Sequence, residues 1–568
     1  MFADAREVPL DTAVAADLCI VGAGAAGITL AREFIGGSAR VVVLESGGTE
    51  FSEETQSLYQ GEDVGLPYFP LDAPRLRYFG GTTNHWAGVC RPFDDVDFEA
   101  RDWIPYSGWP VNKTELDPYY RRAQDVVRLP SDEWDTETWL QADDDSPVRF
   151  DEGRIVTRVD QIVPAEQRSF ASLYGDDLRT ASNVTVYLQA NVMEILTDET
   201  GLGAKSVRVV TLEGNRFSVT ARAFVVAVSG IENARLLLAS RAQIPAGLGN
   251  QNDLVGRFFL EHPRFVAGVI APADPDASVA FYEEHRVDDT IIQPRLAIAR
   301  AVQEAEGMAD VQFSLDPVYD PALEDAVQSA DVESLRALRR VLARRGMGDL
   351  GEHLSRVVSD LMTWHRVTVP GAPLPIPYPE VIGQLMRSTP RERQSLVPGL
   401  FGDVAAFLYA ELKGDLPLNT ILVTARFEPI PDPNSRVTLS DERDEVGMPR
   451  ARLDWRLGDQ DRRNVRRAME ILGEEVGAAG IGRLRILNED GGDDWPPDLV
   501  GGFHLIGTTR MHDDPKRGVV DAAGRIHGLS NLYVAGSSVF PTAGSGNPTM
   551  LIVALALRMA DHLKEALG

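Results

Sequence analysis

The stretch Gly22-Ala-Gly-Ala-Ala-Gly27 decides the fold of this chain, because it joins a buried strand to a helix. Residues 17–21 before it are almost wholly apolar, which predicts a strand covered on both faces. Residues 28–34 after it have a helical pattern, and residues 40–45 form a second apolar run that ends in a carboxylate. This order of strand, glycine turn, helix, strand and acid predicts a dinucleotide-binding unit rather than an ordinary strand-to-helix turn.

Each part of this unit has a mechanical role. Gly22 permits the tight turn, Gly24 removes a side chain so that backbone N–H groups approach a pyrophosphate, and Gly27 lets the helix lie close to the sheet. Glu45 lies 21 positions after Gly24, where a carboxylate accepts hydrogen bonds from an adenosine ribose. A carboxylate there disfavours a 2′-phosphate and therefore NADP.

Length and composition exclude several classes of protein. A chain of 568 residues exceeds the size of a single core, so two or more domains are expected. Its 44% apolar and 25% charged residues are typical of a globular protein. The net charge of −29 argues against nucleic acid and anionic membrane surfaces as partners.

The two cysteines, Cys19 and Cys90, are too few and too far apart for an iron–sulfur cluster or a structural zinc. No metal site is expected. Residues 1–16 lack the basic and apolar regions of a secretory signal, and the apolar run at 550–557 is too short to span a bilayer. We therefore expect a cytoplasmic protein without a membrane span.

The chain passes through the nucleotide-binding sheet more than once. The apolar run at 224–228 is followed by Ser229-Gly230 and a helix over 231–240, which repeats the strand, glycine and helix order. Alternating runs at 421–427 and 436–439 instead predict an antiparallel sheet. The expected fold is α/β, or α+β overall: a discontinuous Rossmann-like FAD-binding domain at 10–100, 181–265 and 491–568, and a substrate domain of mostly antiparallel sheet with helices at 101–180 and 266–490.

A helix-rich, charged segment at 321–397 interrupts the second domain. We interpret it as an amphipathic insert that packs on the domain surface, with an active-site lid or a partner-docking element as the alternatives.

The carboxyl-terminal segment carries the strongest catalytic signals. Pro548 suits the first turn of a helix and Asn547 the position before it, so the positive end of this helix would face the centre of the molecule. Helix capping alone would also explain Asn547. For His504, the alternative to a catalytic role is a core histidine with satisfied hydrogen bonds.

Four ordered blocks resemble the glucose–methanol–choline (GMC) oxidoreductase family. They are the stretch 22–27, the Gly80-Gly81-Thr-Thr loop, Gly230-Ile-Glu-Asn-Ala-Arg235 and the segment 504–548. The resemblance implies FAD as cofactor and oxidation of an alcohol by hydride transfer to flavin N5. It also implies that His504 accepts the alcohol proton and that Asn547 orients the alcohol oxygen.

Within the family, the motifs around His85 and His504 are similar to those of pyranose 2-oxidases and bacterial sugar or glycoside 3-oxidoreductases. In some pyranose oxidases the histidine that matches His85 is covalently joined to the flavin; here a covalent link and a non-covalent packing role stay open. The expected cofactor-binding residues are Gly22, Gly24, Ala25, Ala26, Gly27, Glu45, Ser46, Arg77, Gly80, Gly81, Thr82, Asn84, His85, Trp86, Ala87, Gly88, Val192, Ser229, Gly536, Pro548 and Thr549.

The expected function is oxidation of a secondary hydroxyl of a pyranose sugar or glycoside to a keto-sugar. Electrons would pass to dioxygen, a quinone or another carrier. The alternatives are a GMC enzyme that acts on a non-sugar alcohol, and an inactive flavin-containing binding module. Two departures from the family pattern are the 321–397 segment and His512, a bulky residue after Met511 that needs room. The oligomeric state stays open.

Overall fold

The computed structural model describes residues 1–139, 148–274, 279–318, 420–487 and 495–568. The segment 321–397, which we interpreted as a helical insert, lies outside these residues. No helix in the described ranges has both the length and the apolar composition needed to cross a bilayer.

A six-stranded parallel sheet forms one half of the molecule. Every neighbouring pair in it is parallel. Its strands come from distant parts of the chain, in the spatial order β1 (Phe2–Asp4), β8 (Val184–Leu188), β4 (Val41–Leu44), β3 (Leu18–Val21), β12 (Ala223–Val226) and β21 (Leu532–Val534).

The central strands of this sheet are buried along their whole length, as their apolar runs predict. Helix α1 (Ala25–Glu33) follows the glycine turn directly and begins three residues earlier than the expected helix. It packs against α5 (Phe170–Thr180) and α14 (Pro548–Leu567), and α14 packs on α4 (Lys113–Val127). Helix α6 (Ser229–Ala239) begins two residues before the expected start at 231.

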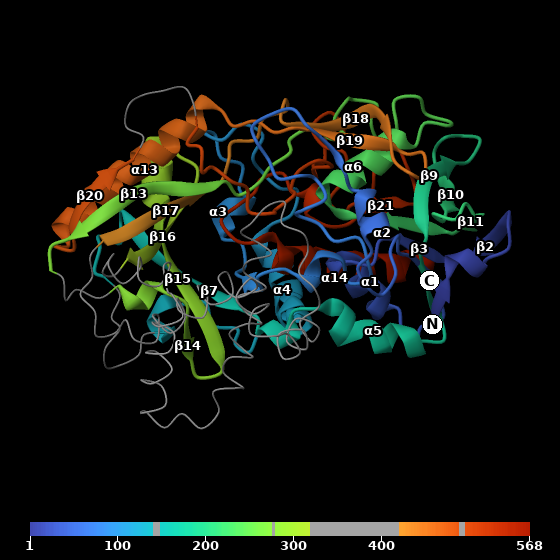
Figure 1. Ribbon diagram of the computed structural model, residues 1–568, viewed down its shortest axis with the longest axis horizontal. Helices are drawn as coiled ribbons and strands as arrows, with labels where there is room; N and C mark the ends of the chain where they lie inside the picture. The colour runs from blue at the N-terminus through green and yellow to red at the C-terminus, as the bar shows by residue number, and fades with distance from the viewer. Residues whose placement is uncertain (140–147, 275–278, 319–419, 488–494) are drawn as a thin grey trace, which may run out of the picture.

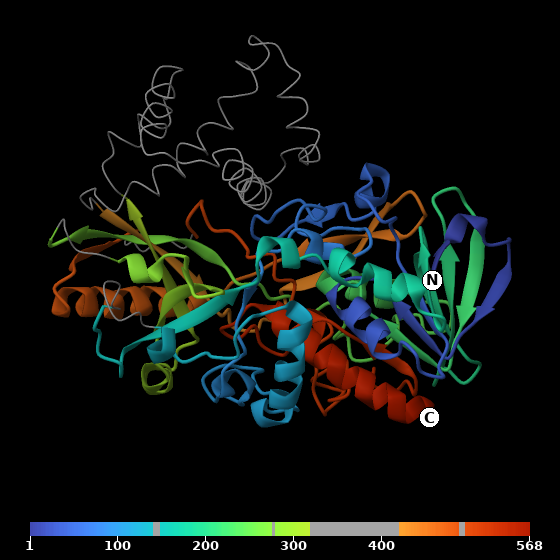
Figure 2. The ribbon, with the colours of Figure 1, turned by 90° about the horizontal axis from the view of Figure 1, so that it is seen from below.

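An eight-stranded antiparallel sheet forms the other half. Figures 1 and 2 place it at one end of the molecule, with α14 near the centre. Its spatial order is β20 (Gly482–Ile486), β13 (Arg264–Pro272), β17 (Thr420–Phe427), β16 (Val311–Val318), β15 (Thr290–Ile298), β7 (Ile155–Ile162) and β6 (Val89–Cys90), with β14 (His285–Val287) paired to β15.

Strand β17 shows how this sheet divides its two faces. Its odd-numbered positions, such as Val423 and Ala425, are fully buried, and its even-numbered positions are partly accessible. Helix α13 (Asp459–Ala478) packs against β16 and β20 and covers the apolar face. The opposite, polar face contacts the loop that precedes α14, because Arg426 and Gln312 both donate to the carbonyl oxygen of Ser545.

Two smaller sheets complete the described architecture. They are β2 (Thr12–Ala15), β11 (Arg216–Thr220), β10 (Ala204–Val210) and β9 (Asn191–Thr197) in one, and β18 (Arg436–Arg443), β19 (Pro449–Asp454) and β5 (Gly61–Asp63) in the other. The remaining helices are α2 (Glu53–Ser57), α3 (Asp95–Phe98) and α7 (Arg300–Glu306).

The sequence of residues 45–79 is polar and rich in glycine, proline and aromatic residues, which predicts an extended connection, but the structure has regular elements there. These residues contain α2 and β5, and β5 pairs in parallel with β19, almost 400 positions later in the chain. A three-residue strand of this kind is stabilised by its partner rather than by its own pattern, so the sequence alone did not reveal it.

The expected domain boundaries stay a prediction. The positions of one strand and two helices bear on them. Strand β1 joins the parallel sheet although it precedes residue 10. Helices α4 and α5 fall in the segment 101–180, which we assigned to the substrate domain, and they pack on α14 and α1.

Candidate active site

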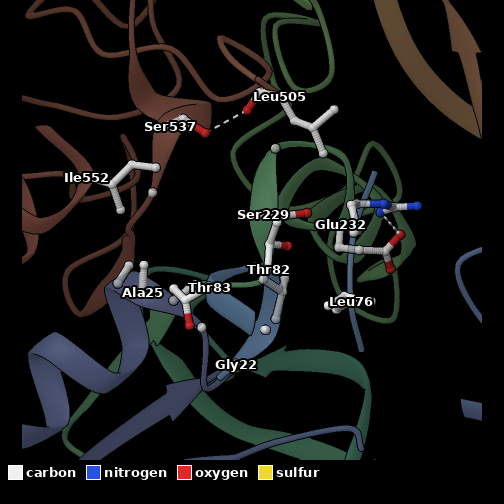
Figure 3. Close-up of a pocket in the computed structure, with 18 of the residues that line it drawn as sticks. Gly22, Ala25, Leu76, Thr82, Thr83, Ser229, Glu232, Leu505, Ser537 and Ile552 are labelled. Atoms are coloured by element: carbon white, nitrogen blue, oxygen red, sulfur yellow. Dashed lines mark hydrogen bonds and ion pairs between the residues drawn. The ribbon is translucent and has the colours of Figure 1, made fainter. Parts of the chain in front are cut away.

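The glycine turn opens onto a large cavity at the carboxyl edge of the parallel sheet. Figure 3 shows Ala25 of α1, Ile552 of α14 and Ser229 of α6 around this cavity, together with Thr82 from the glycine-rich loop. The carboxyl ends of β3 and β12 and the amino ends of α1, α6 and α14 therefore meet at one place. This is where parallel α/β sheets bind their ligands.

The three glycines of the turn have distinct surroundings. Gly22 has a φ of +102°, and a Cβ there would lie 2.5 Å from the carbonyl oxygen of Ala227. A Cβ on Gly27 would lie 1.9 Å from the carbonyl oxygen of Gly22. A Cβ on Gly24 would have no protein atom within 4 Å, and Gly24 borders the cavity. Gly22 and Gly27 are thus required by the protein itself, whereas Gly24 leaves space for a ligand.

Glu45 braces the turn from inside the protein. Its side chain is buried, and its two oxygens accept hydrogen bonds from the backbone N–H groups of Ala23 at 2.9 Å and Gly47 at 3.0 Å. Burial raises its pKa. Glu45 borders the cavity as well, which is compatible with the expected contact with a ribose. That contact stays a proposal.

Most of the residues expected to bind the cofactor border this one cavity. Gly27, Gly80 and Asn84 do not: Gly27 packs on the turn, Gly80 has a φ of +95°, and Asn84 accepts a hydrogen bond from Ser169 and donates one to the carbonyl of Phe79. The expected residues that border the cavity are Gly22, Gly24, Ala25, Ala26, Glu45, Ser46, Arg77, Gly81, Thr82, His85, Trp86, Ala87, Gly88, Val192, Ser229, Gly536, Pro548 and Thr549.

Ser229 is strained and lacks a hydrogen-bond partner for its hydroxyl. Its φ of +82° is unfavourable for a residue with a side chain, and its buried Oγ has no partner in the described chain. Strain and an unsatisfied polar atom together are typical of ligand sites. With the open space beside Gly24, they fit a dinucleotide in this cavity.

His504 faces a second histidine that the sequence analysis did not single out. Nδ1 of His504 lies 2.7 Å from Nδ1 of His262, with the two rings nearly perpendicular. The other ring nitrogen of His262 lies 2.9 Å from the carbonyl oxygen of Gly544. His262 is 1% exposed, whereas His504 is half-buried because its ring borders the cavity.

A buried carboxylate holds the backbone of both histidines. One oxygen of Glu261 accepts hydrogen bonds from the N–H groups of His262 at 3.0 Å, Gly502 at 2.9 Å and His504 at 3.0 Å. The other oxygen accepts one from the hydroxyl of Tyr68. Glu261 therefore joins two segments about 240 positions apart and fixes the backbone from which both imidazole side chains extend.

Asn547 is oriented by an arginine from the antiparallel sheet. Nη1 of Arg426 donates to Oδ1 of Asn547 at 2.7 Å, and Nδ2 of Asn547 donates to the carbonyl of Val89 at 3.3 Å. An arginine only donates and a carbonyl only accepts, so the amide has one orientation. One N–H of the amide is left for the cavity. The alternative that Asn547 only caps α14 is wrong, because its side chain makes no capping hydrogen bond.

The electrostatics of the site keep both histidines neutral. Burial, followed by the charge of Arg426, lowers the pKa of His262 to about 3. Burial lowers the pKa of His504 well below its usual value, and His262, Arg426 and Arg264 lower it further. Arg426 itself forms no ion pair within the described residues, and burial lowers its pKa to about 10. An imidazole in these surroundings is a proton acceptor at neutral pH.

Sequence reasoning missed His262, Glu261 and Arg426. Glu261 and His262 stand directly before β13, and Arg426 occupies one position of an ordinary alternating strand. A buried Glu-His pair is uncommon, but nothing local to it indicates contact with a residue more than 240 positions away. His512, which we expected to crowd its loop, is partly exposed and has room.

The carboxyl-terminal part of the chain matches a known family. Residues 431–556, which include His504 and Asn547, match the family described as GMC oxidoreductase. This part of the chain is therefore that of a GMC oxidoreductase. The chain is 23% identical to 2-methyl-1,2-propanediol dehydrogenase from Mycolicibacterium austroafricanum, over 97% of this chain and 95% of that protein. It is 37% identical to C-glycoside 3-oxidase from Arthrobacter globiformis over 22% of this chain and 23% of that protein.

A solved structure shares the fold of this chain. The crystal structure of formate oxidase superposes on 98% of this chain and 99% of its own, with a TM-score of 0.52 and 16% identity. The expected α/β fold is therefore confirmed, as is the expected enzyme class, an FAD-dependent oxidoreductase acting on CH–OH groups.

Proposed function

We propose that this GMC oxidoreductase oxidises a secondary hydroxyl of a pyranose sugar or glycoside to a ketone. The observation that carries the proposal is the paired placement of His504 and Asn547 at the cavity, beside a polar sheet face. The named relatives include a C-glycoside 3-oxidase, which supports this substrate class.

The polar face favours a hydroxyl-rich substrate over an apolar alcohol. Next to Arg426, Gln312 lies opposite on β16, and Ser314 and Thr424 form the next facing pair. Arg295 of β15 donates to Ser314 at 2.6 Å and to Asp160 of β7 at 2.9 Å. This face begins at the residue that orients Asn547, so a substrate at Asn547 would meet many donors and acceptors. A sterol or aliphatic alcohol would remove water from these polar groups without offering them hydrogen bonds in return, which is costly.

The residues of the chain supply the proton chemistry. His504, neutral because of its lowered pKa, accepts the proton of the substrate hydroxyl on the ring nitrogen that does not face His262. The free N–H of Asn547 donates to the same hydroxyl oxygen and stabilises the negative charge that develops on it. Deprotonation weakens the adjacent C–H bond toward hydride loss.

The cofactor is expected to lie along the cavity from the glycine turn to the amino end of α14. Gly24, Ser229, Gly536 and Thr549 border its path, and the α14 dipole favours negative charge at its end. FAD bound there would supply a hydride acceptor.

Anaerobic bleaching of the bound flavin tests the substrate class. We expect pyranoses or glycosides to bleach the flavin and simple alcohols to leave it oxidised. A 2-methyl-1,2-diol is the most informative competitor, because the relative matched over 97% of the chain is a dehydrogenase of that substrate. Bleaching by the diol and not by any sugar would move the enzyme to the second candidate, a non-sugar alcohol dehydrogenase.

A His504→Ala variant tests the base. We expect it to keep its flavin and to lose substrate-dependent bleaching by a factor of about 10² or more. His512→Ala is the matched control, because His512 lies outside the cavity-lining residues. Equal bleaching in both variants would remove His504 as the base. If no alcohol bleaches even the unmodified enzyme, the chain is a flavin-containing binding module.

Two finer expectations are tested on the same holoenzyme. Admission of air after bleaching distinguishes dioxygen from a quinone or another carrier, because only an oxidase recovers its colour quickly. Acid precipitation tests a bond between flavin and His85, which borders the cavity. A yellow precipitate indicates a covalent link, and a yellow supernatant indicates a non-covalent one.

The cytoplasmic location stays a prediction from the sequence.

A further inference from the structure

The contact between His262 and Gly544 determines which nitrogen of His262 carries a hydrogen. A carbonyl oxygen only accepts hydrogen bonds, so Nε2 of His262, 2.9 Å from the oxygen of Gly544, must be the donor. His262 is buried with its pKa lowered to about 3, so it is neutral and has one N–H group. Its Nδ1 is therefore a bare acceptor.

The same reasoning then applies to His504. Its Nδ1 lies 2.7 Å from the bare Nδ1 of His262, so a hydrogen bond between them needs the hydrogen on His504. A neutral His504 with a hydrogen on Nδ1 has a bare Nε2. Within the described chain Nε2 has no hydrogen-bond partner, and the ring borders the cavity.

We propose that His262 is a positioning residue that holds His504 in the tautomer with hydrogen on Nδ1, so that Nε2 is the atom that accepts the substrate proton. The proposal rests on the proposed function, since it takes His504 as the base. In the step, the O–H bond of the substrate breaks, its proton bonds to Nε2, and the resulting imidazolium keeps donating from Nδ1 to His262.

The surroundings hold this chain of hydrogen bonds rigidly. Gly544 has a φ of +64°, and a Cβ on it would lie 2.4 Å from the ring of Phe93, so its carbonyl has little freedom. The backbone N–H groups of both histidines bind Glu261. The charged groups that face the pair are Glu261 before β13, Arg264 on β13 and Arg426 on β17. Arg426 disfavours a second proton on either ring, and Arg264 disfavours one on His504.

Two substitutions of His262 with nearly equal shape test whether His504 needs a hydrogen-bond acceptor at this position. His262→Asn retains an oxygen that can accept from Nδ1 of His504, whereas His262→Leu has the same size and no acceptor. Neither side chain reaches the position of Nε2, from which His262 donates to Gly544. We expect the rate of flavin reduction to fall about 10- to 100-fold in His262→Leu and to stay within about threefold in His262→Asn, with KM unchanged in both. Equal losses in the two variants would overturn the proposal.

A spectroscopic measurement tests the tautomer without any substrate. The holoenzyme is labelled with ¹⁵N-histidine, and the signals of His504 among the nine histidines are assigned from a His504→Gln variant. We expect a protonated Nδ1 and a bare Nε2 for His504, and a mixture of tautomers in His262→Leu. A hydrogen on Nε2 of His504 in the unmodified enzyme would overturn the proposal even if sugars are the substrate. If His504 has the expected tautomer but sugars do not bleach the flavin, the proposal about His262 holds. Only the proposed substrate class is then contradicted.

Discussion

At the residue scale, the hydrogen-bond partners of Asn547 and His504 determine which of their atoms remain available to a substrate. Arg426 holds the side-chain oxygen of Asn547 and the carbonyl of Val89 accepts one of its N–H groups, while His262 holds one ring nitrogen of His504. Each is thereby left with one group that faces the cavity. The roles of both residues were predicted from a resemblance, and the atoms that we propose for these roles follow only from these neighbours.

The pH dependence of the reaction is a prediction at this scale. A base acts only when it is neutral, so its activity is lost as the pH falls through its pKa. Burial and the nearby arginines hold the pKa of His504 well below 6.5, so this loss begins well below pH 6.5. We expect the stopped-flow rate of flavin reduction to be constant from about pH 8 to about pH 6. A rate that halves near pH 6.5 would contradict the assigned electrostatics.

At the element scale, the turn between β3 and α1 combines a structural and a ligand-binding role. Its local pattern was sufficient to predict a strand, a glycine turn and a helix, because each of those signals lies within a few residues. The same was true of Pro548 at the start of α14. Short elements such as β5 were not predictable, because their partner strand supplies most of their stability.

Two glycine substitutions separate these roles. In Gly24→Ala the new Cβ meets no protein atom within 4 Å, so we expect an unchanged melting temperature of the flavin-free protein and a weaker hold on the flavin. In Gly27→Ala the Cβ would lie 1.9 Å from the carbonyl oxygen of Gly22, so we expect a loss of about 1–3 kcal/mol in stability with or without flavin. Thermal unfolding and flavin titration measure both. Equal flavin affinity in Gly24→Ala and the unmodified protein would argue against a dinucleotide at this turn.

At the scale of the whole molecule, buried ion pairs join segments that are distant in sequence. Glu232 of α6 pairs with Arg75 at 2.8 Å and with Arg235 at 3.0 Å, and Arg235 pairs with Asp444 at 2.6 Å. Both arginine side chains are 1% exposed. This network connects the parallel sheet, through α6, to the loop between β18 and β19.

Removal of Glu232 is expected to destabilise the protein strongly. Glu232→Ala leaves Arg75 and Arg235 buried without this counter-ion, which costs about 3–5 kcal/mol in the free energy of unfolding. Glu304→Ala removes an exposed partner of Arg300 and should cost less than about 0.5 kcal/mol. Urea unfolding monitored by tryptophan fluorescence measures both. A loss in Glu232→Ala as small as that in the control would mean that water reaches the arginines.

The sequence by itself determined the parallel nucleotide-binding fold, the start of α14 and the resemblance to GMC oxidoreductases, because these depend on local patterns and on motifs read in order. Only the tertiary structure decided that Glu261, His262 and Arg426 surround His504 and Asn547. The separations are 242 positions for the two histidines and 121 for Arg426 and Asn547. Contacts over such separations depend on strand register and on how the two sheets meet, and a single sequence carries no local signal for either.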